Sequence, residues 1–164
     1  MASKTKTQAA TPVQAGSKRE RRTLRVDDWM TRVVHSVKPK ENILHARALL
    51  EKERINQLPV VVNGKLVGIV TDRDLRDAFP SVFDSARKPS DDPEKISVDQ
   101  VMTRDVLTLA PDDSVIDAAR LMRKERVGAA PVVEGATIVG LVTRSDLLDA
   151  LIAIAGGELL PDGI

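Results

Sequence analysis

One sequence unit occurs twice in this chain. Residues 26–78 align with residues 98–150 at a constant offset of 72 positions, without a gap, and 23 of the 53 aligned positions are identical. Because only two copies are present, we expect a closed pair with pseudo-twofold symmetry rather than a long solenoid. Each copy would then cover an apolar sheet face of the other.

Local patterns predict the order strand, helix, strand, strand, helix in each copy. Val33–Val37 and Val106–Leu109 contain several β-branched residues and favour a first strand. Apolar residues then recur at the three- and four-residue spacing of one helix face. In chain order, these are Ile43, Ala46 and Leu50 in the first copy, and Val115, Ala118, Ala119 and Met122 in the second.

A hairpin and a second helix complete each copy. Asn63-Gly64 predicts a tight turn between two strands of the first copy, because both residues tolerate positive φ. Gly135-Ala136 is a weaker turn signal at the same place in the second copy. The last helix begins near Asp72 or Asp74 in the first copy, and its counterpart extends toward Ile154.

Composition limits the classes of partner. With 164 residues and 42% hydrophobic content, the chain can form one compact module of two halves. It has no cysteine, which excludes disulfides, thiolate metal sites and a cysteine nucleophile. A net charge of +1, two Phe, one Trp and no Tyr disfavour a nucleic-acid partner. No apolar run approaches the ~18 residues that span a bilayer, so we expect no membrane partner.

The flanking segments predict where the module begins and ends. The N-terminal segment has no hydrophobic stretch, so it is not a secretory signal, and we expect a cytoplasmic protein. An organelle transit peptide stays open, because no acidic residue precedes Glu20. The basic residues from Lys18 to Arg25 are either a solvated segment or a nucleic-acid or targeting contact. The predicted divisions are a disordered basic tail at 1–22, repeats at 23–80 and 96–155, a linker at 81–95, and a flexible tail at 156–164.

Two copies of one motif point to a known family. Gly68–Asp74 and Gly140–Asp146 both read Gly-hydrophobic-x-Thr-x-x-Asp, and each follows a strand with the sequence Leu/Ala-Pro-Val. With these motifs, residues 26–150 resemble a tandem pair of cystathionine β-synthase (CBS) domains, an arrangement called a Bateman module. The resemblance implies an α/β (α+β) fold of two βαββα repeats packed with pseudo-twofold symmetry.

The resemblance also implies a function. CBS pairs of this kind bind AMP, ADP, ATP or S-adenosylmethionine in the cleft between the repeats, as a regulatory ligand rather than a catalytic cofactor. They signal the binding to an effector protein, which here is unknown. A homodimer packed through the helices is the implied assembly; the apolar row that includes Leu147, Leu148, Leu151 and Ile154 fits either that interface or the core of a monomer.

The motif residues have suitable chemistry for a ribose. Thr71 and Asp74 lie where a strand enters a helix, and free backbone N–H groups at such an end favour anions. A carboxylate can accept hydrogen bonds from both vicinal ribose hydroxyls, each worth about 1.5 to 3 kcal/mol. The resemblance gives this role to Thr71, Asp74, Thr143 and Asp146. The alternative is a helix N-cap, worth about 1 kcal/mol.

The resemblance further predicts an adenine wall and phosphate contacts. Arg54 and Arg126 are candidate phosphate ligands, or else cations that favour a helix C-terminus. Arg144 replaces Asp72, so we expect an extra cation at the Thr143/Asp146 pocket and an extra anion at the other. Each pocket would combine the Thr/Asp pair of one copy with the wall of its partner, although any wall residue could instead be core. The wall residues are Val34, His35, Ile55, Asn56, Leu58, Val106, Leu107, Val127, Gly128 and Ala130.

Catalysis has little support in the sequence. There is no P-loop, Gly-x-Gly-x-x-Gly or His-Glu-x-x-His motif. His35 and His45 have no recognisable partner, and helix starts and a linker explain the paired aspartates, so we predict neither a metal site nor an enzyme. The alternative to a nucleotide sensor is a protein- or nucleic-acid-interaction module with empty clefts that acts through its basic N-terminal arm.

Overall fold

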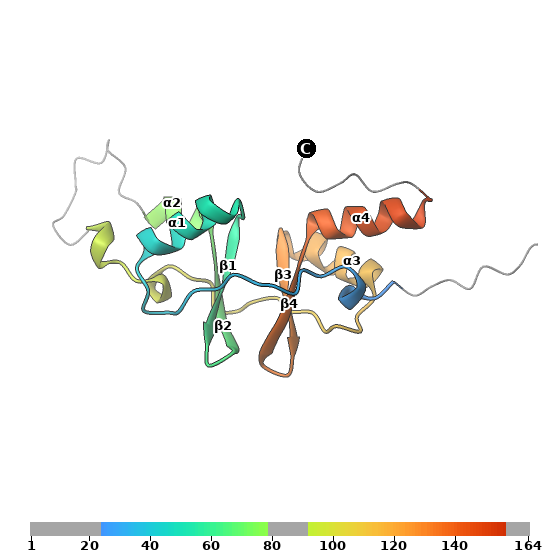
Figure 1. Ribbon diagram of the computed structural model, residues 1–164, viewed down its shortest axis with the longest axis horizontal. Coiled ribbons are helices and arrows are strands. Elements are labelled where there is room, and N and C mark those ends of the chain that lie inside the picture. Colours follow the sequence, from blue (N-terminus) through green and yellow to red (C-terminus); the bar gives the residue numbers. More distant parts are fainter. Residues whose placement is uncertain (1–23, 79–91, 157–164) are drawn as a thin grey trace, which may run out of the picture.

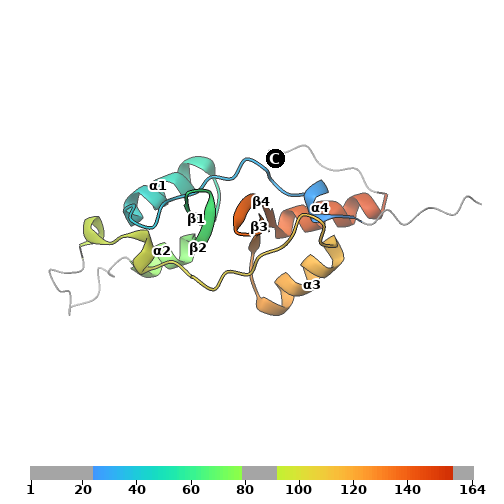
Figure 2. The ribbon, with the colours of Figure 1, turned by 90° about the horizontal axis from the view of Figure 1, so that it is seen from below.

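The computed structural model describes residues 24–78 and 92–156, and within them two similar halves lie side by side. In each half a helix precedes a β-hairpin and a second helix follows it. The hairpins lie at the centre of the molecule and the helices at its two outer sides (Figures 1 and 2). The elements are α1 (Ile43–Glu53), β1 (Gln57–Val62), β2 (Lys65–Thr71), α2 (Asp72–Ala78), α3 (Val115–Glu125), β3 (Ala129–Glu134), β4 (Thr137–Thr143) and α4 (Arg144–Ile154), with short 3-10 helices at Val26–Asp28, Pro93–Lys95 and Val98–Gln100.

The two hairpins form one antiparallel sheet in the order β1-β2-β4-β3, and they meet near their tips. The register pairs only Lys65 of β2 with Thr137 of β4. Two further backbone bonds flank this pair: Leu66 N donates to Ala136 O at 3.0 Å, and Ile138 N donates to Gly64 O at 3.2 Å. The joint between the halves within the sheet is therefore narrow.

The N-terminal segment of each repeat crosses to the opposite half. Leu24 O accepts a hydrogen bond from Val115 N at the start of α3, and Ile96 O accepts one from Ile43 N at the start of α1. Residues 24–32, here called the first arm, thus belong structurally to the second half. Residues 96–104, the second arm, belong to the first half. Neither sequence copy completes its own half.

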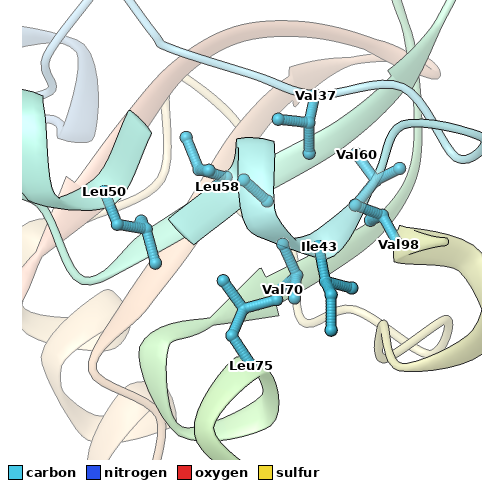
Figure 3. Packing of buried hydrophobic residues seen from close by; sticks show 9 residues of the cluster. Val37, Ile43, Leu50, Leu58, Val60, Val70, Leu75 and Val98 are labelled. Carbon is cyan, nitrogen blue, oxygen red and sulfur yellow. The ribbon is translucent and has the colours of Figure 1, made fainter. Parts of the chain in front are cut away.

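Each hydrophobic core includes residues of a crossing arm. In the first half, Val98 of the second arm is fully buried beside Ile43 (Figure 3). In the second half, Val26 of the first arm is fully buried against the α3 and β3 side chains. The predicted helix stripes are confirmed except at Ala119, which is only half-buried. The buried residues are Ile43, Ala46 and Leu50 in α1, and Val115, Ala118 and Met122 in α3.

The glycines of the two motifs allow the arms to pack closely. A Cβ atom at Gly68 would lie 2.6 Å from Met102 Sδ and 3.0 Å from Thr103 O. At Gly140 a Cβ would meet the Met30 side chain, with Cγ at 2.9 Å. Each motif glycine is therefore the site where the methionine of a crossing arm contacts the strand.

The predicted first strand of each repeat is wrong. The structure has only isolated parallel bridges there, Val37 to Val60 and Leu109 to Val132. Pairing does not extend toward the N-terminus in the first copy, where Val33 is 80% exposed. Toward the C-terminus it meets Pro39, which has no N–H to donate.

The rest of the predicted order is confirmed, including the mixed α/β class, the Asn63-Gly64 hairpin and the extension of α4 to Ile154. The predicted N-terminal tail and most of the linker and C-terminal tail lie outside the described residues. Among the residues that are described, no helix is both long and apolar enough to cross a membrane.

Candidate functional site: the cleft between the halves

A cleft of about 490 Å³ opens between the two halves. Its volume is within the range of small-molecule sites. The first half contributes the end of β2 and the start of α2, including Thr71 and Asp74. The second half contributes Val106, Leu107 and Gly128. Both sequence copies therefore supply surface to one site, as predicted for a pocket that combines the motif of one repeat with the wall of the other.

Thr71 and Asp74 are locked to each other at the strand-to-helix junction. Thr71 N and Thr71 Oγ1 both donate to Asp74 Oδ2, at 2.8 and 2.7 Å. In return, Asp74 N donates to Thr71 Oγ1 at 3.2 Å. This reciprocal pattern is a capping box, which satisfies N–H groups at the start of α2. The N-cap role that the sequence allowed is thus present.

The second motif has the same geometry. Thr143 N and Oγ1 donate to Asp146 Oδ2 at 2.6 and 2.8 Å, and Asp146 N donates to Thr143 Oγ1 at 3.4 Å. In both motifs the bonds go to one carboxylate oxygen, Oδ2. Within residues 24–78 and 92–156, the other oxygen of Asp74 accepts no hydrogen bond. The capping bonds therefore fix the orientation of the carboxylate and leave Asp74 Oδ1 able to accept a hydrogen bond from a ligand.

Five of the ten predicted wall residues line the cleft. They are Asn56, Val106, Leu107, Val127 and Gly128. Leu58 and Ala130 do not, which corrects the prediction: both are fully buried in the hydrophobic cores, because they occupy inward positions of β1 and β3.

The other three predicted wall residues are not part of the lining of this cleft. Ile55 packs against the first core. The His35 Nε2 atom lies 3.5 Å from a carboxylate oxygen of Glu53, and Val34 is half-buried.

The expected anion lies at the cleft of Thr71 and Asp74, and the cation of the second motif reaches this cleft as well. Arg144 lines the cleft of Thr71 and Asp74, together with Asp72, so this cleft has both signs of charge. Tertiary contacts hold Arg144 there: Arg144 N donates to Gly128 O at 3.1 Å, and Nε donates to Val127 O at 3.3 Å. Val127 and Gly128 also line the cleft, so these bonds keep the side chain at its edge.

The two predicted phosphate arginines differ in position. Both end their helices in the left-handed conformation, with φ of 54° at Arg54 and 59° at Arg126. Arg126 lines the cleft, whereas Arg54 is not part of its lining. The two arginines therefore have the same backbone conformation, as the repeat predicts. Only Arg126 contributes a side chain to this site.

The sequence reasoning missed several lining residues. Thr103 reaches the cleft from the second arm and Asp105 from just after it, and Arg73 and Arg76 reach it from α2. The matched Met-Thr-Arg segments of the two copies were the available signal for the arm. That signal gave no indication of which half the arm would join.

Comparison with known proteins agrees with this architecture. The sequence profile of the CBS domain matches residues 26–81 and 98–153. The chain belongs to the CBS domain family. The two CBS domains form a tandem Bateman module, which confirms the resemblance inferred from the motifs.

Individual relatives include free-standing proteins of similar length. A CBS domain-containing protein of Dictyostelium discoideum is 43% identical over 110 residues, which cover 64% of this chain and 75% of the relative. The crystal structure of CBSX2 in complex with AMP superimposes with a TM-score of 0.70 at 30% identity, over 80% of this chain and 98% of that one.

A second solved structure contains other adenosine compounds. The CBS domain pair of protein MJ0100, in complex with 5-methylthioadenosine and S-adenosyl-L-methionine, has a TM-score of 0.68 at 30% identity. The match covers 80% of this chain and 98% of that chain. Similar CBS pairs thus bind adenosine-containing molecules.

Proposed function

We propose that this CBS pair is a regulatory module that binds an adenosine nucleotide in the cleft between its halves. The observation that carries the proposal is the Thr71–Asp74 pair. Its hydrogen bonds fix the carboxylate, and no donor in the described part of the chain occupies the Oδ1 atom, which can therefore accept from a ribose diol. An apolar surface from the other half, at Val106 and Leu107, lines the same cleft and suits an adenine ring.

The charged groups suit the phosphate end of such a ligand. Arg73, Arg126 and Arg144 line the cleft, and an arginine fork matches phosphate oxygens. Asp72 also lines the cleft, and its negative charge disfavours a ligand with several phosphate groups. We therefore assign the ribose to Asp74, the base to the Val106–Leu107 surface and the phosphate to these arginines. AMP, ADP, ATP and S-adenosylmethionine remain the candidate ligands.

Thr143 and Asp146 have the geometry for a second nucleotide of the same class. Their capping box repeats that of the first motif, with the same carboxylate oxygen engaged. The proposal assigns Arg54 to this second ligand, because Arg54 is the repeat equivalent of Arg126. The number of nucleotides bound per chain, measured by calorimetry, tests separately whether this second site is occupied.

A nucleotide that contacts both halves in the cleft would shift their relative orientation. In the sheet, the halves pair only at Lys65 and Thr137, so a ligand that contacts both can favour one orientation. The shift cannot exceed the difference in affinity between the two orientations. The output would pass to a separate effector protein or to a homodimer packed through the helices. The cytoplasmic location stays a prediction.

Calorimetry with AMP, ADP, ATP and S-adenosylmethionine tests the proposal, with GMP as the matched control. At about 100 times its Kd, a ligand adds roughly 2.7 kcal/mol to stability, so thermal unfolding gives an independent readout. We expect at least one adenosine compound to bind better than GMP. We also expect it to be recovered unchanged, because the proposal assigns no catalytic step. Equal binding of GMP, or no binding by any compound, contradicts the proposal.

A further inference from the structure

A second concave surface lies on the outer side of the second half, between α3 and α4. This groove has a volume of about 740 Å³ and an apolar floor. Ile116, Leu148 and Leu151 line it while 55 to 59% exposed, which is high for large aliphatic side chains. Exposed apolar surface of this extent is typical of a binding site.

Helix α1 has different side chains at the positions that line the groove on α3. Arg47 and Glu51 form an ion pair at 3.0 Å on that helix. The equivalent positions on α3 are Ala119 and Arg123, and both line the groove. A charge pair on one half is thus replaced by a small apolar residue and a single cation on the other.

The second helices differ in the same way. Asp72 and Arg76 form an ion pair at 3.0 Å on α2. Their equivalents on α4 are Arg144 and Leu148. Because both outer helices changed together, the second half has an apolar floor and unbalanced positive charge where the first half has paired charges.

The rim of the groove is basic. Arg120, Arg123, Arg126 and Arg144 all line it. Arg120 pairs with Asp117 at 3.0 Å on the exposed surface, and Arg144 bonds to a backbone oxygen. Among the described residues, the guanidinium groups of Arg123 and Arg126 have no ion pair. The fitting occupant is therefore an apolar segment with carboxylates at its sides.

The chain contains such a segment directly after α4. Residues 157–164 read Gly-Glu-Leu-Leu-Pro-Asp-Gly-Ile, with two acids, three large aliphatic residues and no Lys or Arg. Gly156 ends the helix with φ of 79°, a left-handed conformation that turns the chain off the helix axis. Eight residues extend to about 26 Å, whereas the 11 residues of α4 span about 16 Å. The segment can therefore reach the whole groove.

We propose that residues 157–164 fold back and bind in the α3–α4 groove of their own chain, with Leu159 and Leu160 on the apolar floor and Glu158 and Asp162 toward the arginines. The segment then competes for this face with a second copy of the protein. Self-association through α3 and α4 requires the segment to leave. This inference does not depend on nucleotide binding in the cleft.

Disulfide trapping tests the proposal, because the chain has no cysteine of its own. The test variant is Ala119→Cys with Leu159→Cys, oxidised over a dilution series and analysed without reductant. We expect an intrachain disulfide whose yield is independent of dilution. The matched control is Ala48→Cys with Leu159→Cys, which places the thiol on α1 and should not close. Interchain products alone, or equal closure of both pairs, overturn the proposal.

Charge reversal separates specific binding from chance collision. Adding Arg120→Glu and Arg123→Glu to the test pair should lower the intrachain yield several-fold, and neither arginine lines the nucleotide cleft. Removal of residues 157–164 should strengthen self-association in sedimentation equilibrium. An unchanged disulfide yield or unchanged self-association contradicts the proposal whatever the result of nucleotide titrations.

Discussion

The two halves of this CBS pair share the hydrogen bonds of their motifs and the contacts of their crossing arms, and they differ on the outer faces of their helices. Both motifs form the same capping box, and both motif glycines contact a methionine of a crossing arm. On the outer helices, the first half has the Arg47–Glu51 and Asp72–Arg76 ion pairs, and the second half has an arginine-rimmed apolar groove.

The exchange of arms explains this contrast. Because the arm of each repeat packs on the other half, a change in the motif of one copy affects the fit of the other copy's arm. Each motif glycine and the arm methionine that packs on it are therefore constrained together. No residue of α1 or α3 lines the cleft between the halves, so a change on the outer face of either helix does not alter this site. A duplicated fold can thus keep one shared site and acquire a separate surface.

The largest expected effect separates the two cores. Leu58 is fully buried in the first half, and its equivalent in the second half is the smaller Ala130. Leu58→Ala should lower the free energy of unfolding by about 2 to 5 kcal/mol, because it leaves a cavity. Urea denaturation should remain one cooperative transition, since each core contains an arm of the other copy. Two separate transitions would show that the halves fold independently.

The next effect distinguishes the two motifs. Asp74→Ala should weaken AMP binding in the cleft by about tenfold to a hundredfold, the loss of one charged hydrogen bond. Asp146 has the same capping geometry, so Asp146→Ala is the matched control for lost helix stability. It should change the affinity of that cleft by no more than about twofold. Because Asp146 belongs to the proposed second site, the affinity is read from the amide signals of Thr71 and Leu107, which line this cleft. Equal losses of affinity at these signals in both variants would remove the assignment of Asp74.

A smaller effect should separate the two left-handed arginines. Arg126 lines the cleft and Arg54 is not part of its lining, although both end a helix in the same conformation. Arg126→Ala should weaken ATP binding by about fivefold, the value of an exposed ion pair near 1 kcal/mol. Arg54→Ala should leave the affinity of this cleft unchanged. The opposite order in competition binding would place the phosphate elsewhere.

The smallest effect concerns pH and the second arm. The hydrogen bond from Lys40, at 2.7 Å, and then that from Ser97 lower the pKa of Asp99. A lowered pKa stabilises the folded state above the unfolded pKa of about 3.9, and this contribution disappears as pH falls through the folded value. Unfolding of Asp99→Asn should therefore differ slightly from wild type near pH 7 and converge with it near pH 2. A constant difference across that range contradicts the ion-pair role.

The sequence predicted the features that depend on the local spacing of residues. It did not predict the features that depend on which half a segment packs against. Helical periodicity correctly gave the buried faces of α1 and α3, and the motif spacing placed Thr71 and Asp74 at the strand-to-helix junction. The repeat could not show that Val98 enters the first core, because its equivalent Val26 has the same sequence context. The repeat also gave no sign that Arg144 would line the cleft of Thr71 and Asp74, because its backbone contacts with Val127 and Gly128 are tertiary.

Two other errors have local causes. The stretch around Val37 has the composition of a strand, yet its pairing ends after one residue because Pro39 follows. Leu58 and Ala130 precede the prolines of the edge strands β1 and β3, and strand alternation directs them into the cores rather than into the cleft. Alternation counted from Val60 of β1 and Val132 of β3 would have identified them as core.

Backbone amide NMR during titration with AMP tests the central claim most directly, because it locates a ligand without changing the protein. The account predicts saturable shifts at Thr71, Asp74, Leu107 and Gly128, which come from both halves and line one cleft. GMP at the same concentrations should shift these signals less. Saturable shifts confined to one half or to α3 and α4, or no shifts at all, would contradict a nucleotide site between the two CBS domains.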